Sequence, residues 1–181
     1  MPVNPVLNLR GWFEDHKDML KPPVGNKLIY EDKDWVVMGV GGPNSRSDYH
    51  FHHRGPEFFF MVKGDMMLKM KKEENGKLVD DDIVIKEGEV FMMPRETIHS
   101  PQRPAGSFGL VLEPKALHGE KDYLRWYCDK CSHLLANYEF LLKNIVTELP
   151  PLMKKFFDTK ELRTCKECGT YMEDPKPFVM P

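Results

Sequence analysis

Three histidines and one glutamate are crowded into a short stretch of the sequence. The stretch RSDYHFHHRGPE covers residues 46–57 and is followed at once by the apolar run FFFMVKG. Neutral imidazoles and carboxylates are common ligands of divalent iron. Because side chains alternate along a strand, His50 and His52 would share one face and His53 would point to the other. The stretch therefore predicts a metal site at the entrance to a buried strand, and a solvated loop is the alternative.

A further imidazole follows in the segment GEVFMMPRETIHSPQR, where Pro94 opens a turn and His99 enters the next strand. Glu57 begins its own apolar run and would lie on the same side of it as Phe59. Two imidazoles and one carboxylate on the inner face of a barrel form a facial triad, which leaves positions on Fe(II) open for substrate and oxygen. We therefore expect His50, Glu57 and His99 to hold a catalytic iron.

The elements that must position these side chains are short strands. Between Lys27 and about Glu113, short apolar or alternating runs are separated by glycine-containing turns, and Asn75-Gly76 marks the clearest hairpin. This pattern predicts a mainly β fold built on a small antiparallel barrel or sandwich, over residues 27–114. Residues 1–26 are expected to form a helical segment that packs on the barrel, and residues 115–181 a helical tail with its own metal site.

Two helices are expected outside the barrel. In the first, Leu9, Trp12, Phe13 and Leu20 share one face, and the segment KPPVGN ends it. The second covers SHLLANYEFLLKNIVTEL, residues 132–149, and is expected to end at Pro150-Pro151. Its apolar side chains form one stripe: Leu134, Leu135, Tyr138, Leu141, Leu142 and Ile145.

Four cysteines form two tight pairs, Cys128-x2-Cys131 and Cys165-x2-Cys168. Two such pairs, here called hooks, can together bind one tetrahedral metal ion, because each pair presents two thiolates from a turn. Two disulfides or a redox-active pair are the alternatives. Four thiolates suit iron and zinc alike, so we expect a second iron, or a zinc, with a structural role.

Composition excludes several classes of protein. The 181 residues are 41% hydrophobic and 30% charged, with a net charge of −2, which is typical of a globular domain without a basic surface for nucleic acid. The first residues, MPVNPVLNLRGWF, lack the pattern of a signal peptide, and no apolar run approaches the ~18 residues of a spanning helix. We expect a cytoplasmic protein that binds neither nucleic acid nor membrane.

The spacing of the ligands narrows the prediction to a family. His50-x-His52-x4-Glu57-x6-Gly64 and Gly88-x5-Pro94-x4-His99 resemble the two motifs of the cupin superfamily. The segments RSDYH, EFFF, HSPQR and LVLE, with the N-terminal segment and the two cysteine pairs, resemble the 3-hydroxyanthranilate 3,4-dioxygenases. The resemblance spans almost the whole chain and implies a jelly-roll-like cupin barrel.

The resemblance also implies an activity. Enzymes of this family use Fe(II) and O2 to open the ring of the aromatic substrate 3-hydroxyanthranilate. The product is 2-amino-3-carboxymuconate semialdehyde, in the kynurenine route to quinolinate and NAD. The cysteine site would correspond to a rubredoxin-like iron site, remote from the chemistry, and the assembly to a homodimer.

Position by position, the resemblance makes His50, Glu57 and His99 the iron ligands. Arg46 and Arg103 match the arginines that hold the substrate, for whose carboxylate a planar guanidinium is well suited. For either arginine, a solvated surface charge is the alternative.

The family pattern also bears on three further side chains, those of Glu113, Asp48 and His52. Glu113 matches the acidic partner of the substrate, with a structural role as the alternative, and Asp48 would lie behind the metal ligands. The chain departs from the family pattern at His52, by one extra residue before the glutamate, and by one residue fewer before Glu113. We expect His52 not to bind the metal. The alternative is a three-histidine, one-glutamate site in another metal-dependent cupin enzyme that acts on a different small molecule.

Overall fold

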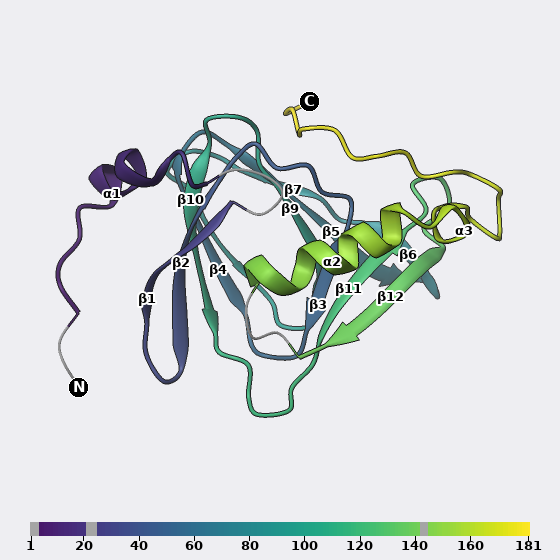
Figure 1. Ribbon diagram of the computed structural model, residues 1–181, viewed down its shortest axis with the longest axis horizontal. Helices are drawn as coiled ribbons and strands as arrows, with labels where there is room; N and C mark the ends of the chain where they lie inside the picture. The colour runs from purple at the N-terminus through teal and green to yellow at the C-terminus, as the bar shows by residue number, and fades with distance from the viewer. Residues whose placement is uncertain (1–3, 21–24, 142–144) are drawn as a thin grey trace.

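Two curled antiparallel sheets make up most of the molecule (Figure 1) in this computed structural model, which describes residues 4–20, 25–141 and 145–181. The first sheet contains, in spatial order, β1 (Asn26–Glu31), β2 (Trp35–Gly41), β10 (Phe108–Pro114), β4 (Glu57–Lys63) and β8 (Val90–Met93). The second contains β12 (Leu134–Phe140), β11 (Asp122–Tyr127), β3 (Tyr49–His52), β9 (Ile98–Gln102), β5 (Met66–Glu74) and β6 (Lys77–Asp80), while β7 (Ile83–Ile85) pairs with β5. The predicted mainly β barrel is confirmed.

The main core lies between the two sheets. Burial alternates along β4, so that Glu57, Phe59 and Met61 point inward, as the sequence pattern predicts. Phe59 and Met61 are fully buried. The core comprises Val40, Phe59, Met61, Met66, Leu68, Met70, Ile85, Met93 and Val111. The space between the sheets is therefore filled largely by apolar side chains.

The expected N-terminal helix is present as α1 (Leu9–His16). The side chain of Asn8 accepts a hydrogen bond from the N–H of Gly11 at 3.0 Å and so caps its first turn. Phe13 is buried and stacks on Phe108 of β10, with ring centroids 3.6 Å apart. This contact attaches the helix to the first sheet. The expected break at KPPV, residues 21–24, lies outside the described residues.

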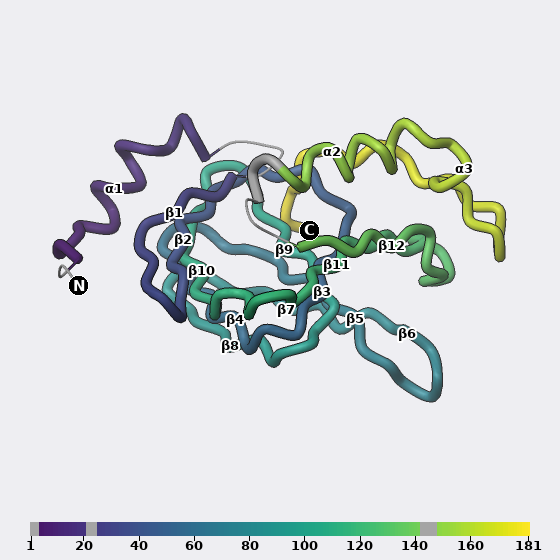
Figure 2. The backbone as a smooth tube through the Cα atoms, turned by 60° about the horizontal axis from the view of Figure 1, so that its bottom comes forward, coloured from purple at the N-terminus to yellow at the C-terminus, as the bar shows by residue number. Residues whose placement is uncertain are grey.

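The predicted hairpin at Asn75-Gly76 joins β5 to β6. Both residues have positive φ, +52° and +74°, which suits a turn of the type that asparagine and glycine favour. Glu74 pairs with Lys77 across it. Figure 2 shows the hairpin projecting from the body of the barrel.

The helix expected over residues 132–149 is wrong in its first half. Residues Leu134–Phe140 form the edge strand β12, in which Tyr138 pairs with Leu124 of β11. Apolar residues at helical spacing can also form a strand, because hydrogen bonding to a neighbouring strand overrides the weak preference of the segment for a helix. Of the expected stripe, Leu134 is half exposed, and Leu142 and the side chain of Ile145 lie outside the described residues.

Helix α2 (Ile145–Phe157) continues through Pro150 and Pro151, so the expected end at these prolines is also wrong. A proline inside a helix costs about 3 kcal/mol, but here the helix buries an apolar face. Leu149 and Phe156 are fully buried, and Phe156 stacks on Trp126 of β11 at 4.3 Å. Figure 1 shows α2 lying across β11 and β12.

The short helix α3 (Lys160–Arg163) follows α2. Among the described residues, no helix is long and apolar enough to cross a membrane. The division of the chain at residues 26 and 114 stays a prediction, although β11 pairs with β3 and thus continues the second sheet beyond Pro114.

Replacing Leu149 with alanine should lower the free energy of unfolding by about 2–5 kcal/mol, because it leaves a cavity beside Trp126. Leu134→Ala is the matched control and should change it by less than ~0.5 kcal/mol, because this strand residue is 44% exposed. Urea unfolding followed by tryptophan fluorescence measures both. A large loss for Leu134→Ala would contradict the strand assignment.

Candidate active site

A compact group of metal-ligating side chains lies where β3, β4 and β9 meet. His52, Glu57 and His99 each offer a ligand atom, and these atoms lie within 4.8 Å of one another. The Glu57 carboxylate is 2.5 Å from His52 Nε2 and 3.2 Å from His99 Nε2. All three residues are buried. Two imidazoles around one buried carboxylate fit a divalent cation of the iron type.

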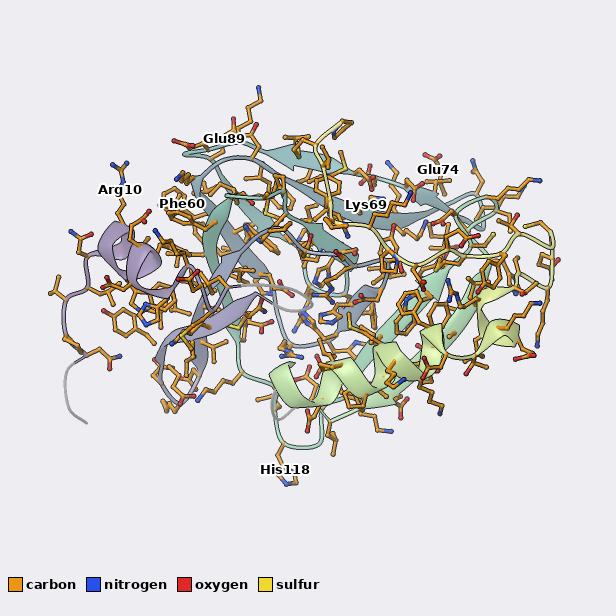
Figure 3. The ribbon with its side chains drawn as sticks, turned by 45° about the horizontal axis from the view of Figure 1, so that its top comes forward. Arg10, Phe60, Lys69, Glu74, Glu89 and His118 are labelled. Carbon is orange, nitrogen blue, oxygen red and sulfur yellow. The ribbon has the colours of Figure 1, made fainter. Side chains whose placement is uncertain are left out.

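This burial is unusual for charged groups in the chain. Arg10, Glu74 and Glu89 point away from the barrel in Figure 3 and are exposed. Burial alone would raise the pKa of Glu57, but the charge of His99 and the hydrogen bonds from His52 and His99 outweigh it and hold that pKa well below its usual range. Glu57 is therefore an ionised carboxylate, ready to bind a cation.

His99 is oriented by the backbone. Its Nδ1 lies 2.9 Å from the carbonyl oxygen of Thr97 and donates to it, because a carbonyl can only accept. Nε2 faces Glu57 and donates to it, and a metal ion bound there would replace that proton while the bond from Nδ1 stays in place. A hydrogen bond of this kind fixes the tautomer of metal-binding histidines.

His50 lies close to this group but has a different partner. It pairs with His99 across β3 and β9, and the two ring centroids are 6.0 Å apart. Its Nε2 is 3.1 Å from Nη2 of Arg46 and accepts its hydrogen bond. Arg46 also forms a buried ion pair with Asp48. The structure thus places His50 beside Glu57 and His99, with its lone pair on Arg46. As expected, His53 points outward and is half exposed.

A cavity adjoins these residues and contains most of the predicted site. His50, Glu57 and His99 line it, together with the predicted substrate residues Arg46, Arg103 and Glu113. His52 does not line the cavity and lies behind Glu57. The remaining lining residues are Gly25, Asn26, Met38, Val40, Gly41, Asn44, Phe59, Pro101 and Val111. The lining of the cavity therefore combines charged, polar and apolar side chains.

The guanidinium of Arg103 is almost fully buried, and only part of it has a partner. Its Nη1 lies 3.1 Å from the sulfur of Met61. Its Nε and Nη2 have no hydrogen-bond partner among the described residues. Burial lowers the pKa of Arg103 to about 10, so it stays protonated at neutral pH. A buried cation with unpaired donors is costly unless an anion completes it.

Glu113 is flanked by two basic groups, one of which sequence reasoning missed. Its carboxylate oxygens lie 3.8 Å from His52 Nε2 and 3.8 Å from Nη1 of Arg54. Arg54 is buried and forms an ion pair with Asp122 of β11. Burial, and next the charge of Glu57, raise the pKa of Glu113 to about 7. Arg54 follows the histidine cluster in the sequence, but only the pairing of β3 with β11 reveals its position.

The four cysteines form a second site. Cys128 Sγ is 3.5 Å from Cys168 Sγ, and Cys131 Sγ is 3.6 Å from both Cys165 and Cys168. All four are free thiols, and these distances exceed the ~2.05 Å of a disulfide. A tetrahedral ion with bonds of about 2.3 Å needs sulfur atoms about 3.8 Å apart. The cluster therefore fits one metal ion, and the disulfide reading does not fit.

The two hooks have the same backbone design. The N–H groups of Ser132 and Gly169 each donate to the carbonyl of the first cysteine of their pair, both at 2.9 Å. These two residues have positive φ, +54° and +72°. Cys128 N–H bonds to His133, and Cys165 N–H to Thr170, both at 2.8 Å. Each turn thus presents two sulfur atoms on one side.

Comparisons with known proteins show the family of the chain. The model of the family described as 3-hydroxyanthranilic acid dioxygenase matches residues 1–157. The chain belongs to this family. A relative from Xanthomonas euvesicatoria pv. vesicatoria, named 3-hydroxyanthranilate 3,4-dioxygenase, is 48% identical over 97% of this chain and 96% of its own. A relative of the same name from Brucella anthropi is 45% identical over 95% of this chain and 93% of its own.

Family membership confirms the predicted resemblance and the prediction of a dioxygenase enzyme. Among solved structures, a cupin-2 domain containing protein from Shewanella frigidimarina is similar, with a TM-score of 0.45 and 19% identity over 61% of this chain and 95% of that one. The second cysteine pair lies beyond the residues that the dioxygenase family model matches.

If the cysteine cluster and the barrel each hold one metal ion, replacing Cys128 with serine should lower the content from two ions per chain to one, because three thiolates hold the ion less well than four. Metal analysis after gel filtration measures the stoichiometry. The melting temperature should fall, since the ion connects the β11–β12 turn to the C-terminal segment. Lys130→Ala, within the same hook, is the control and should keep both ions. Unchanged metal content in Cys128→Ser would contradict a four-thiolate site.

Proposed function

We propose that this dioxygenase uses Fe(II) and O2 to open the ring of 3-hydroxyanthranilate and release 2-amino-3-carboxymuconate semialdehyde, in the kynurenine route to quinolinate and NAD. The names of the relatives support the substrate. The observation that carries the proposal is the buried guanidinium of Arg103, a residue that lines the same cavity as Glu57 and His99 and has two donors without a partner among the described residues.

Arg103 is proposed to bind the carboxylate of the substrate. A guanidinium offers two donors in one plane, which match the two oxygens of a benzoate carboxylate. Binding would supply the missing partners of Nε and Nη2 and neutralise a buried charge. Arg46 lies on the same cavity and already pairs with Asp48, so it contributes less uncompensated charge.

The iron ligands are proposed to be His50, Glu57 and His99, because all three line the cavity where the substrate must bind. A bound ferrous ion supplies the reactivity toward O2 that protein side chains lack. His52 is proposed to hold the Glu57 carboxylate from behind through their 2.5 Å contact. For His50 to bind the ion, Arg46 must release its Nε2, and such contacts often rearrange when a site is loaded.

Glu113 is proposed to accept a hydrogen bond or a proton from the amino or hydroxyl group of the substrate. It lines the cavity, so its carboxylate can reach a ligand there. The apolar side chains of Met38, Phe59 and Val111 line the cavity as well and exclude water from the ring. The residues thus divide into an anion-binding side, a metal-binding side and an apolar side.

A second candidate function is that of a cupin enzyme with four metal ligands and a different small substrate. The proximity of His52 to both Glu57 and His99 favours it. A homodimer and a cytoplasmic location remain predictions that rest on the sequence and on the resemblance.

Oxygen uptake tests the proposed function. Protein loaded with Fe(II) under anaerobic conditions should consume one O2 per 3-hydroxyanthranilate when air is admitted, because both oxygen atoms enter the product. The absorption of a conjugated semialdehyde should rise in step. Fully loaded protein that consumes no oxygen would contradict the proposal.

Arg103→Met should raise KM for 3-hydroxyanthranilate about 10- to 100-fold, since a hydrogen-bonded charge pair contributes about 1.5–3 kcal/mol. Arg103→Lys should recover part of this loss, because it keeps the charge without the planar pair of donors. Arg10→Met, on the exposed face of α1 (Figure 3), is the control and should leave KM unchanged. Steady-state oxygen uptake gives these values.

Two histidine variants separate the two candidate functions. If His50 is the ligand, His50→Ala should lose the barrel iron and all oxygen uptake. His52→Ala should keep the iron and lose only part of the rate, because Glu57 is less well held. Metal analysis and the spectrum of the nitrosyl complex report the result. Loss of iron in both variants would favour the four-ligand alternative, because both imidazoles would then bind the ion. Iron retained in His50→Ala would contradict the proposed ligand set.

A further inference from the structure

The C-terminal segment, residues 173–178, runs from the four-cysteine site back to the barrel. Figures 1 and 2 show it passing from α3 toward the strands of the second sheet. It forms no helix or strand. Pro175 and Pro177 fix its backbone in an extended form, which reduces the entropy lost when it is held in place. The segment also lies outside the residues that the family model matches.

The start of the segment is held firmly by Arg163, which is buried. Its Nε donates to the carbonyl of Met172 at 2.8 Å, and its Nη1 donates to the carbonyl of Phe157 at 3.0 Å. Its Nη2 lies 3.0 Å from the carboxylate of Asp174. The N–H of Met172 in turn donates to the carbonyl of Arg163 at 2.9 Å. The segment therefore leaves the cysteine site in a fixed direction.

The far end of the segment is attached to Asn44. The N–H of Phe178 donates to the carbonyl of Asn44 at 2.9 Å. Asn44 is buried, and its other polar groups bind Pro101 of β9 and Arg103, the residue after that strand. Its N–H donates to the Arg103 carbonyl at 3.0 Å, and its Oδ1 accepts from the Arg103 N–H at 2.8 Å. Its Nδ2 donates to the Pro101 carbonyl at 2.7 Å.

The middle of the segment borders the other substrate arginine. Glu173, Asp174, Pro175 and Lys176 line the same cleft as Arg46 and Ser47. The segment thus lies beside the loop that carries Arg46 and is bonded, through Asn44, to the backbone of Arg103. Arg46 and Arg103 both line the cavity. The backbone that carries each of them therefore lies next to the segment or is bonded to Asn44, which the segment contacts.

We propose that residues 173–178 are a strap that positions Arg103 and the loop of Arg46 for the carboxylate of the substrate, with Asn44 as the positioning residue that links them. This inference rests on the proposed function. The four-cysteine site then has a role in substrate binding, because it fixes the point from which the strap starts. Among the described residues, no hydrogen bond or ion pair joins the strap to His50, Glu57 or His99, so it acts on substrate binding and leaves the ring-opening step unchanged.

The test removes the hydrogen bond at the far end. Phe178→Pro deletes the donor N–H and should raise KM for 3-hydroxyanthranilate about 3- to 10-fold, as expected for one hydrogen bond, with kcat unchanged. Phe178→Ala keeps the N–H and removes the ring, and Val179→Pro adds a proline one residue later, where the side chain is exposed. Both controls should keep the KM of the unmodified protein. Both metal ions should remain bound in all three variants.

Anaerobic binding of 3-hydroxyanthranilate, followed by calorimetry, gives a second readout that does not depend on turnover. Phe178→Pro should weaken it by the same factor as KM. Unchanged KM and unchanged binding in Phe178→Pro, in a protein that opens the ring, would overturn the strap and leave the proposed function intact. Binding without ring opening would overturn the proposed function, and the affinity of Phe178→Pro would still decide the strap. A protein that does not bind the compound would overturn both.

Discussion

The pairing of β3 with β9 is the constraint on which the centre depends. It places His50 directly opposite His99 and, together with the first residue of β4, brings imidazoles and a carboxylate to one point. In a sheet, a slip of one residue turns every side chain to the other face. The apolar inner face of β4 prevents such a slip, because it would expose Phe59 and Met61. The packing of the core therefore holds the register of the site.

Charge is distributed unevenly around the cavity, and this distribution suits an anionic aromatic ligand. Arg46 has an acidic partner in Asp48, and Arg54 has one in Asp122, whereas Arg103 has none among the described residues. Isolated charges are rarely buried in a protein interior, because the loss of hydration costs several kcal/mol. Of these three arginines, Arg103 is the cation without an acidic partner among the described residues, and it therefore marks the position at which a carboxylate gains most by binding.

The C-terminal part of the chain is connected to the barrel by packing and by single hydrogen bonds. Helix α2 covers β11 and β12 through the stack of Phe156 on Trp126. The two cysteine hooks then bring the β11–β12 turn next to residues 165–168. From there the chain returns to Asn44. A metal site far along the sequence is in this way physically continuous with the wall of the cavity.

The sequence by itself determined the kind of chemistry. The motif from His50 to Glu57, the motif that ends at His99, the two cysteine pairs and the hairpin at Asn75-Gly76 are each short local patterns, which a sequence encodes directly. The barrel was predictable for the same reason, because alternating apolar runs between glycine turns are a local signal.

Tertiary structure decided the rest. Residues 134–140 have apolar spacings that suit a helix, and only the free edge of β11 made them a strand. The proximity of His52 to Glu57, the ion pair of Arg54 with Asp122 and the attachment of Phe178 to Asn44 join residues from different elements. Such contacts depend on how strands pair and how the chain returns on itself. No local pattern specifies them, because their free energy arises only when the whole barrel has closed.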